Sequence, residues 1–253
     1  MINHLSVSQI NMYLRCPRQW EFRYIEGIKV PPVGAIIQGK AYHAALADNF
    51  IHKMFVETDL TEEDVADSFS THFDTQVHQH ISRDEEDTVE FDEVNWEGKE
   101  PGKIKDEGIS LVKLYRQRIA SSIKPVSVEL EDNLLIGLVQ FNLITDLVTE
   151  DTIIDHKVKS RRFSDDDLQR DLQATAYSLA YNLPFNFHVA LKQTKPEIAV
   201  QATTRTERDW AFFRELVPLV WRAIQTGIYP PSPNGWHCSE QWCGYWKLCQ
   251  GRQ

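Results

Sequence analysis

Apolar residues recur with a helical period of three to four through most of the first half of the chain. Ser6 or Ser8 can cap the first helical segment, and Pro17 marks a break within it. Glu and Asp after Thr61 give a start signal for a later helix. Four helical segments are predicted here, over residues 9–24, 40–55, 61–79 and 106–123.

Two polar stretches separate the last two of these helices. Residues 84–97 carry eight acidic side chains and no basic one, and residues 97–103 contain Gly, Pro and Lys in a short run. Such composition is typical of loops, so we expect a surface loop over both stretches.

The apolar period changes to two between residues 126 and 159, which predicts strands. We expect a meander of three strands, over 126–132, 134–148 and 152–158, with a tight polar turn at 149–151. Helical spacing returns afterwards at 165–182 and 206–227, on either side of two strands at 186–194 and 197–204. The order of elements predicts an α/β fold in which a mixed β-sheet is flanked by helices and preceded by a helical N-terminal region.

Length and composition favour one soluble domain over residues 1–253. A chain of 253 residues with 42% hydrophobic residues can bury one sizeable core. It divides into a mainly helical part (1–125), a part with the sheet and a helix (126–203), and a part with a helix and most of the cysteines (204–253). No apolar run of about 18 residues occurs and the N-terminus lacks the layout of a signal peptide, so we expect a cytoplasmic protein without a membrane partner.

Charge is unevenly distributed. The net charge of −10 argues against a generally basic coat for nucleic acid, while KVKSRR at 157–162 carries four basic residues in six. Lys159, Arg161 and Arg162 in this segment could form a rim that binds phosphates, although a solvated basic turn has the same composition.

The strand at 152–158 carries the strongest candidate chemistry. Alternation places Asp155, Lys157 and Lys159 on one face, and Asp146 on the preceding strand can stand near Asp155 across the turn. Two close carboxylates repel unless a cation or proton lies between them, and such oxygen ligands favour Mg²⁺ or Mn²⁺. Alternating charges on a solvated strand face are the alternative interpretation.

Other polar residues add weaker signals. Gln173 and Tyr177 lie four apart on one helical face, where they could reach the sheet edge, yet a half-buried Tyr beside a surface Gln is equally ordinary. His43 alone is more often structural than a ligand.

The four cysteines are Cys16, Cys238, Cys243 and Cys249, three of them within the last sixteen residues. In a reducing compartment such clustering indicates a metal or redox chemistry rather than disulfides. A zinc site of three cysteines with His237 is an alternative, in which Cys16 would be a buried thiol. Adjacent His237 and Cys238 make that geometry awkward.

Several short motifs occur in a fixed order along the chain: GKAYH ending at His43, ITD ending at Asp146, IIDHK at 153–157 and QATAY at 173–177, followed by the cysteines. Together they resemble the RecB-like branch of the PD-(D/E)XK nuclease superfamily. This branch includes CRISPR-associated exonucleases and phage-borne relatives in which one early and three late cysteines hold a [4Fe–4S] cluster. The resemblance implies a restriction-endonuclease-like sheet and an iron–sulfur C-terminus.

The resemblance also implies roles for individual residues. His43, Asp146, Asp155 and the backbone carbonyl of His156 would bind the catalytic Mg²⁺ or Mn²⁺. Lys157 would position the attacking water, and Gln173 and Tyr177 would orient the site and contact DNA. Cys16, Cys238, Cys243 and Cys249 would hold the cluster, with zinc as the alternative metal.

The expected function is therefore metal-dependent hydrolysis of DNA, as an exonuclease on ends or single strands in recombination, repair or CRISPR adaptation. The setting would be the cytoplasm of a bacterial, archaeal or phage-infected cell, with recombination or CRISPR-adaptation proteins as partners. The chain has no Walker A motif and so no recognisable ATP motor. Two other hypotheses are a catalytically weak DNA-binding adaptor and a zinc-stabilised interaction protein.

Overall fold

A six-stranded mixed sheet forms the centre of the molecule. The computed structural model describes residues 2–81 and 94–250. The strand order is β1-β3-β4-β5-β6, and β2 pairs with β3 along its other edge. Parallel pairing joins β1 to β3 and β4 to β5, and the other neighbours are antiparallel. The strands are β1 Leu5–Ser6, β2 Ser127–Ile136, β3 Val139–Val148, β4 Ile153–Lys159, β5 Phe185–Leu191 and β6 Glu197–Thr203.

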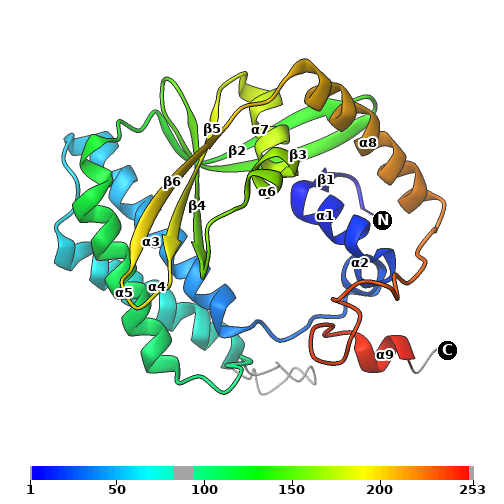
Figure 1. The fold of residues 1–253 in the computed structure, drawn as a ribbon, viewed down its shortest axis with the longest axis horizontal. Coiled ribbons are helices and arrows are strands. Elements are labelled where there is room, and N and C mark those ends of the chain that lie inside the picture. The colour runs from blue at the N-terminus through cyan, green and yellow to red at the C-terminus, as the bar shows by residue number, and fades with distance from the viewer. Residues whose placement is uncertain (1, 82–93, 251–253) are drawn as a thin grey trace.

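Helices cover both faces of this sheet (Figure 1). One group packs beside β4, β5 and β6 and consists of α3 Gly34–Val56, α4 Glu62–Ile81 and α5 Pro101–Arg118, with the short 3-10 turn Ala120–Ser122. The opposite group packs on β2, β3 and β5 and consists of α1 Val7–Arg15, α7 Leu172–Tyr181 and α8 Glu207–Gln225. Three shorter helices complete the chain, α2 Pro17–Tyr24, α6 Asp165–Arg170 and α9 Trp246–Gln250.

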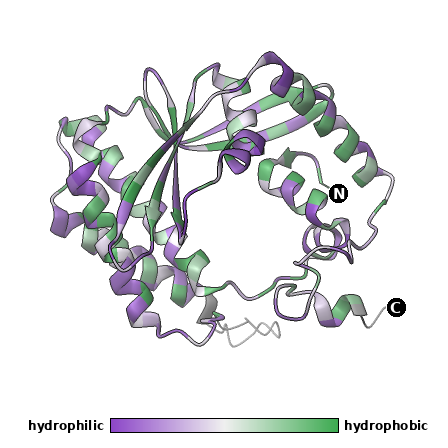
Figure 2. Cartoon of the chain, viewed as in Figure 1, coloured by the Kyte–Doolittle hydropathy of each residue, from purple (hydrophilic) through white to green (hydrophobic). Residues whose placement is uncertain are grey.

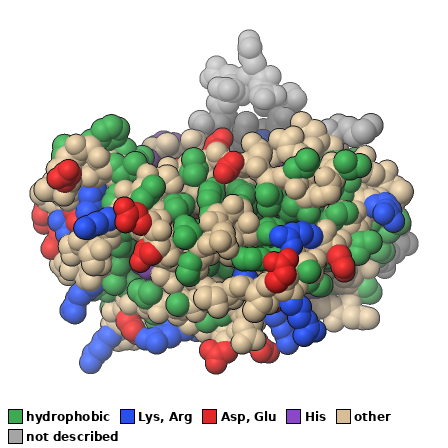
Figure 3. Space-filling view, turned by 90° about the horizontal axis from the view of Figure 1, so that it is seen from above, with side chains coloured by type: hydrophobic (Ala, Val, Ile, Leu, Met, Phe, Trp, Pro, Cys, Tyr) green, Lys and Arg blue, Asp and Glu red, His purple; other side chains and the backbone are tan. Residues whose placement is uncertain are grey.

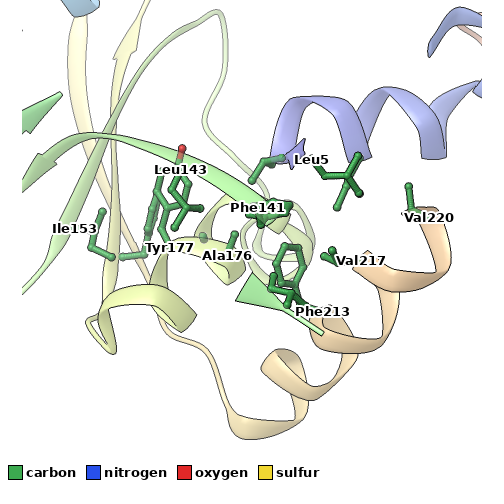
Figure 4. Close-up of a cluster of buried hydrophobic side chains, with 14 of the residues drawn as sticks. Leu5, Phe141, Leu143, Ile153, Ala176, Tyr177, Phe213, Val217 and Val220 are labelled. Atoms are coloured by element: carbon green, nitrogen blue, oxygen red, sulfur yellow. The ribbon is translucent and has the colours of Figure 1, made fainter. Parts of the chain in front are cut away.

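Each face of the sheet has its own hydrophobic core. Leu5, Phe141 and Phe213 are fully buried in one core, where β1, β3 and α8 meet (Figure 4). Phe50 and Tyr115 are fully buried in the other, beneath α3 and α5. Hydrophobic and hydrophilic residues alternate along the helices, as expected when one side of each helix is buried (Figure 2). The expectation of a mixed sheet flanked by helices is confirmed.

Local chemistry explains several helix ends. Ser6 caps α1 by accepting a hydrogen bond from Gln9 N, as predicted for one of the two serines. The chain leaves helical geometry at Cys16, and Pro17 begins α2 in the position where its missing N–H costs least. Thr206 forms a capping box with Asp209 at the start of α8.

Some predicted boundaries were wrong. The single strand predicted over 134–148 is a hairpin, because Gly137 adopts φ +63° and turns the chain between β2 and β3. The expected loop at 97–103 ends at Pro101, where α5 begins, and α3 begins six residues before Lys40. The helix predicted over 165–182 is two helices, because Asp171 has extended backbone and caps α7.

The predicted acidic loop at 84–97 lies mostly outside the described residues, which omit 82–93. In the described residues, the helices are all too short or too polar to span a membrane. On the surface seen from above, apolar side chains are spread among charged ones (Figure 3). Leu138 at the β2–β3 turn is among the exposed apolar residues, with 96% of its surface accessible.

The packing of α4 on α5 predicts opposite effects for two glycines of α5. A Cβ at Gly108 would lie 2.0 Å from Phe69 Cζ, whereas a Cβ at Gly102 would have no atom within 4 Å. Gly108→Ala should lower the free energy of unfolding by about 1–3 kcal/mol, because the fully buried Phe69 ring must move. The matched control Gly102→Ala should leave it unchanged or raise it by up to about 1 kcal/mol. Urea unfolding of both variants measures the difference, and equal stabilities would contradict the packing.

Candidate active site

The candidate site forms where β3 and β4 separate. These strands pair only at Leu147 with Ile154 and Val148 with Ile153. Beyond these two pairs, a side chain replaces backbone pairing between the strands. Asp146 Oδ2 on β3 accepts a hydrogen bond from the His156 N–H on β4 at 2.8 Å. A side-chain carboxylate thus joins the two strands at the mouth of the gap between them.

Asp155, Lys157 and Gln173 form a closed ring of polar contacts at this edge. Lys157 Nζ lies 2.7 Å from Asp155 Oδ2, and Gln173 Nε2 donates to Asp155 Oδ1 at 2.6 Å. Lys157 Nζ in turn donates to Gln173 Oε1 at 3.1 Å. The predicted proximity of Asp155 to Lys157 is observed, and α7 delivers Gln173 onto the pair.

His43 approaches from the opposite face of the sheet. Its position in α3 brings Nδ1 to 3.0 Å from Asp146 Oδ2. The site therefore draws side chains from four elements, the neighbouring β3, β4 and α7 and the much earlier α3.

The two aspartates have opposite ionisation properties. Burial raises the pKa of Asp155 to about 6, with the charge of Asp146 adding to the effect and Lys157 opposing it. Burial alone would also raise the pKa of Asp146, but the charge of His43 and hydrogen bonds from His156 and His43 hold it well below 3.8. Neighbouring carboxyl groups with separated pKa values are characteristic of sites with divided chemical roles.

The cations of the site are stabilised by these carboxylates. Burial alone would lower the pKa of the Lys157 ammonium, but the charges of Asp155 and Asp146 raise it above 10.5. For His43, burial likewise acts to lower the pKa, and Asp146 outweighs it by its charge and its hydrogen bond. Lys157 therefore remains charged at neutral pH.

Tyr177, the other residue of the predicted helical pair, faces the sheet instead of solvent. Its hydroxyl donates to the backbone carbonyl of Ile144 at 2.6 Å, and burial raises the pKa of Tyr177 to about 12. Here Tyr177 attaches α7 to β3, whereas Gln173 makes the contacts to the charged groups.

The predicted phosphate-binding rim is divided. Arg162 pairs with Glu197 on the surface, and the Lys159 ammonium lies over the Phe163 ring at 3.6 Å from its centre. Lys159 also lines an open cleft of about 760 Å³ beyond the end of β4. The cleft is also lined by Lys99, Lys103 and Lys192 and by the carboxylates Glu100 and Glu107, of which Glu100 pairs with Lys103.

All four cysteines line one small pocket between the two ends of the chain. Cys16 precedes α2 and the other three belong to the C-terminal segment, as Figure 1 shows for α2 and α9. His237 lines the same pocket. Burial, followed by the charges of the other cysteines, raises the pKa of Cys238 and of Cys249, so neighbouring thiolates disfavour one another. Gln19 Nε2 donates to Cys243 Sγ at 3.1 Å.

Three residues near the site had no recognised signal in the sequence. Tyr115 and His188 lie directly behind His156 in the core, and only their polarity within apolar segments could have drawn attention to them. Glu129, with φ +47°, lies between Val128 and Leu130, whose partners on β3 flank Asp146, and burial followed by the charge of Asp146 raises its pKa.

Within residues 2–81 and 94–250, no three His, Cys, Asp or Glu side chains are arranged as a metal site. The chemistry of the donor set at β3 and β4 nevertheless suits a hard divalent cation, because it offers two carboxylates and an imidazole. The four thiols suit a thiophilic metal.

Comparisons with known proteins found one matching family model and similar solved structures. A family model of the PD-(D/E)XK nuclease superfamily matches residues 4–250. The crystal structure of a protein from Eubacterium rectale named "Putative exonuclease" is similar at a TM-score of 0.60 and 13% identity, covering 99% of this chain and 88% of that one. The crystal structure of SSO0001 gives a TM-score of 0.42 at 11% identity, covering 100% and 88%. No curated protein matches the sequence.

The contact between His43 and Asp146 predicts a pH dependence. A His whose pKa is raised on folding contributes stability that is complete below its ordinary pKa of 6.5 and is lost as pH rises through the raised value. Asp146→Asn should lower the pKa of His43, because burial and the charge of Lys157 are then opposed only by the charge of Asp155, the smallest of the causes that raise it. NMR titration of EDTA-treated protein measures this. Asp48→Asn, which alters the separate exposed pair with His72, is the control and should leave His43 unchanged. An unchanged pKa in Asp146→Asn would contradict the geometry.

Proposed function

The chain belongs to the PD-(D/E)XK nuclease superfamily, and we propose on this basis that it is a divalent-metal-dependent deoxyribonuclease that hydrolyses phosphodiester bonds of DNA. The observation that carries the proposal is the ring of Asp155, Lys157 and Gln173 beside the contact of Asp146 with His43. Holding the half-buried Lys157 ammonium beside the buried Asp155 carboxylate costs desolvation free energy, and a stable core would not require such a pair.

His43, Asp146, Asp155 and the backbone carbonyl of His156 are the donors that we assign to Mg²⁺ or Mn²⁺. Such an ion supplies Lewis-acid polarisation of a phosphoryl oxygen and lowers the pKa of a bound water. In the structure His43 pairs with Asp146 and Asp155 pairs with Lys157, so the donor side chains are held in two ion pairs rather than standing as independent surface groups.

The protein's own groups perform the remaining tasks. Lys157 carries its charge at neutral pH and can hold an attacking water or offset negative charge as a phosphodiester becomes pentavalent. Gln173 fixes the separation between Lys157 and Asp155 by bonding to both. The Asp155 carboxyl, with a pKa of about 6, is largely ionised at pH 7.

We propose that the substrate is DNA with free ends or single-stranded regions. The net charge of −10 disfavours a broad DNA-binding surface, so contact would be concentrated at local basic features. Support for a local basic feature comes from Lys159 at the end of β4, which lines a cleft together with three further lysines and two glutamates. Arg161 and Arg162 belong to the same proposed rim. The family resemblance is the basis for three finer proposals: cleavage as an exonuclease, a role in recombination, repair or CRISPR adaptation, and protein partners in these processes.

We further propose that Cys16, Cys238, Cys243 and Cys249 hold a [4Fe–4S] cluster. Support comes from the shared pocket and from the raised pKa of Cys238 and Cys249, which a bound cation would reverse. The cluster would connect α2 to the C-terminal segment. Because His237 lines the pocket as well, zinc bound by a set that includes His237 is the competing assignment.

A nuclease assay tests the main proposal. End-labelled linear single- and double-stranded DNA and closed circles are incubated with Mg²⁺ or Mn²⁺. Asp155→Ala should reduce the rate by at least about 100-fold. The control Asp151→Ala changes an exposed Asp of the adjoining β3–β4 turn and should retain activity. Degradation of linear DNA alone would support an exonuclease. If folded wild-type protein cleaves no substrate, the deoxyribonuclease proposal fails and a DNA-binding adaptor becomes the better hypothesis.

Metal analysis tests the cysteine assignment. Protein purified without oxygen should contain iron and acid-labile sulfide, and Cys16→Ser and Cys243→Ser should both lose them and lower the melting temperature, because the cross-link between the chain ends is removed. Asp155→Ala should keep its iron, because Asp155 does not line the cysteine pocket. Stoichiometric zinc without iron would reject the cluster, and unchanged iron in Cys16→Ser would exclude that residue as a ligand.

A further inference from the structure

A chain of buried side chains lies behind the site and ends at Asp146. His188 Nδ1 is 2.8 Å from the Tyr115 hydroxyl, and this hydroxyl is 3.0 Å from His156 Nε2. On the other side of the His156 ring, Nδ1 faces Asp146 Oδ2 at 3.6 Å. Tyr115, His156 and His188 are 0%, 2% and 4% exposed, so water does not compete for these contacts.

The positions of the protons follow from what each group can donate. At 3.6 Å a protonated Nδ1 is attracted to the Asp146 carboxylate, whereas an Nδ1 lone pair would be repelled by it, so the His156 proton belongs on Nδ1. Asp146 is already paired with His43, and a further positive charge on either buried ring would be costly, so both His156 and His188 are neutral. His156 Nε2 therefore accepts, and Tyr115 must donate to it.

One further step completes the direction of the chain. A tyrosine hydroxyl has a single proton, so once Tyr115 donates to His156 it can only accept from His188. His188 must then carry its proton on Nδ1. Every donor in this sequence points towards Asp146, in the order His188, Tyr115, His156.

Every hydrogen bond and ion pair that Asp146 makes with the described residues goes to Oδ2, from His156 and His43. The His156 ring is itself held by Phe50, which stacks on it with 15° between the planes and 6.1 Å between the centres. The carboxylate is thus fixed through one oxygen, and Oδ1 is the oxygen left for a ligand.

We propose that Tyr115 and His188 are positioning residues that act through His156, setting its tautomer so that Asp146 presents Oδ1 to the divalent cation. This inference rests on the nuclease function proposed above. Buried polar groups generally find partners, so mutual satisfaction in the core is the simpler explanation. Mutual satisfaction alone predicts neither a common direction of the hydrogen bonds nor an effect on metal affinity.

The wild-type protein tests the direction without any substitution. In ¹⁵N-histidine-labelled protein, NMR should show both His156 and His188 as the Nδ1–H tautomer, with assignments from single His variants. Either ring found as the Nε2–H tautomer would overturn the proposal.

A matched pair of tyrosine variants tests the effect on metal. Tyr115→Phe removes the central hydroxyl and should raise the Kd for Mn²⁺, measured by calorimetry, by about tenfold or more, the usual effect of removing a group that supports a metal ligand. Tyr42 packs edge-on against Tyr115 at 6.3 Å, is equally buried, and its hydroxyl has no hydrogen-bond partner among the described residues. Tyr42→Phe should therefore leave the Kd within about twofold. Equal Mn²⁺ affinities in folded Tyr115→Phe and wild type would overturn the positioning role.

A second pair applies if Tyr115→Phe does not fold. His188→Asn keeps an N–H near the Nδ1 position, whereas His188→Leu removes it at similar volume. His188→Asn should restore Mn²⁺ affinity relative to His188→Leu, and no difference between them would count against the chain. If wild-type protein binds Mn²⁺ and cleaves DNA, and these variants bind Mn²⁺ with the same affinity, only the positioning role is rejected. Wild-type protein that does neither would reject the nuclease proposal.

Discussion

The hydrogen bond from the His156 N–H to Asp146 Oδ2 is the contact on which the site depends. Backbone pairing between β3 and β4 ends two residue pairs after their turn, and the same edge of β3 pairs with β1 further along, at Phe141 and Asn142. A gap in a sheet normally exposes unpaired backbone groups, which is costly when they are buried. The Asp146 carboxylate satisfies one of them, and it thereby stands at the mouth of the gap, opposite Asp155.

Charge balance explains why these carboxyl groups can be so close. Asp155 is almost fully buried and is compensated by Lys157, while Asp146 is compensated by His43 and by the N–H of His156. The compensation is unequal, so the pKa of one carboxyl is raised and that of the other is lowered. An uncompensated pair at this position would lower stability, so each cationic or N–H partner has a structural function in addition to any chemical one.

The rest of the fold keeps these partners in register. Gln173 reaches Asp155 only because Asp171 stops α6 and caps α7, and Tyr177 then attaches α7 to the β3 carbonyl at Ile144. Arg205 stabilises the same junction by donating to the carbonyl oxygens of Leu168 and Asp171. At the other end of the molecule, the cysteine pocket joins α2 to the C-terminal segment, so the first and last parts of the chain meet away from the sheet.

The sequence alone determined the features that depend on residues only a few positions apart. Alternation in β4 placed Asp155 beside Lys157, helical spacing placed Gln173 and Tyr177 on one turn, and Pro17 marked the helix break. The apolar run at 134–148 hid the turn at Gly137, because both strands of that hairpin carry apolar residues and the pattern continues through the turn. Tyr115 and His188 gave no local signal, because their partners are 41 to 73 residues away. Only the tertiary structure decides which isolated polar residues share a buried location, since hydrogen bonding in a core depends on distance in space.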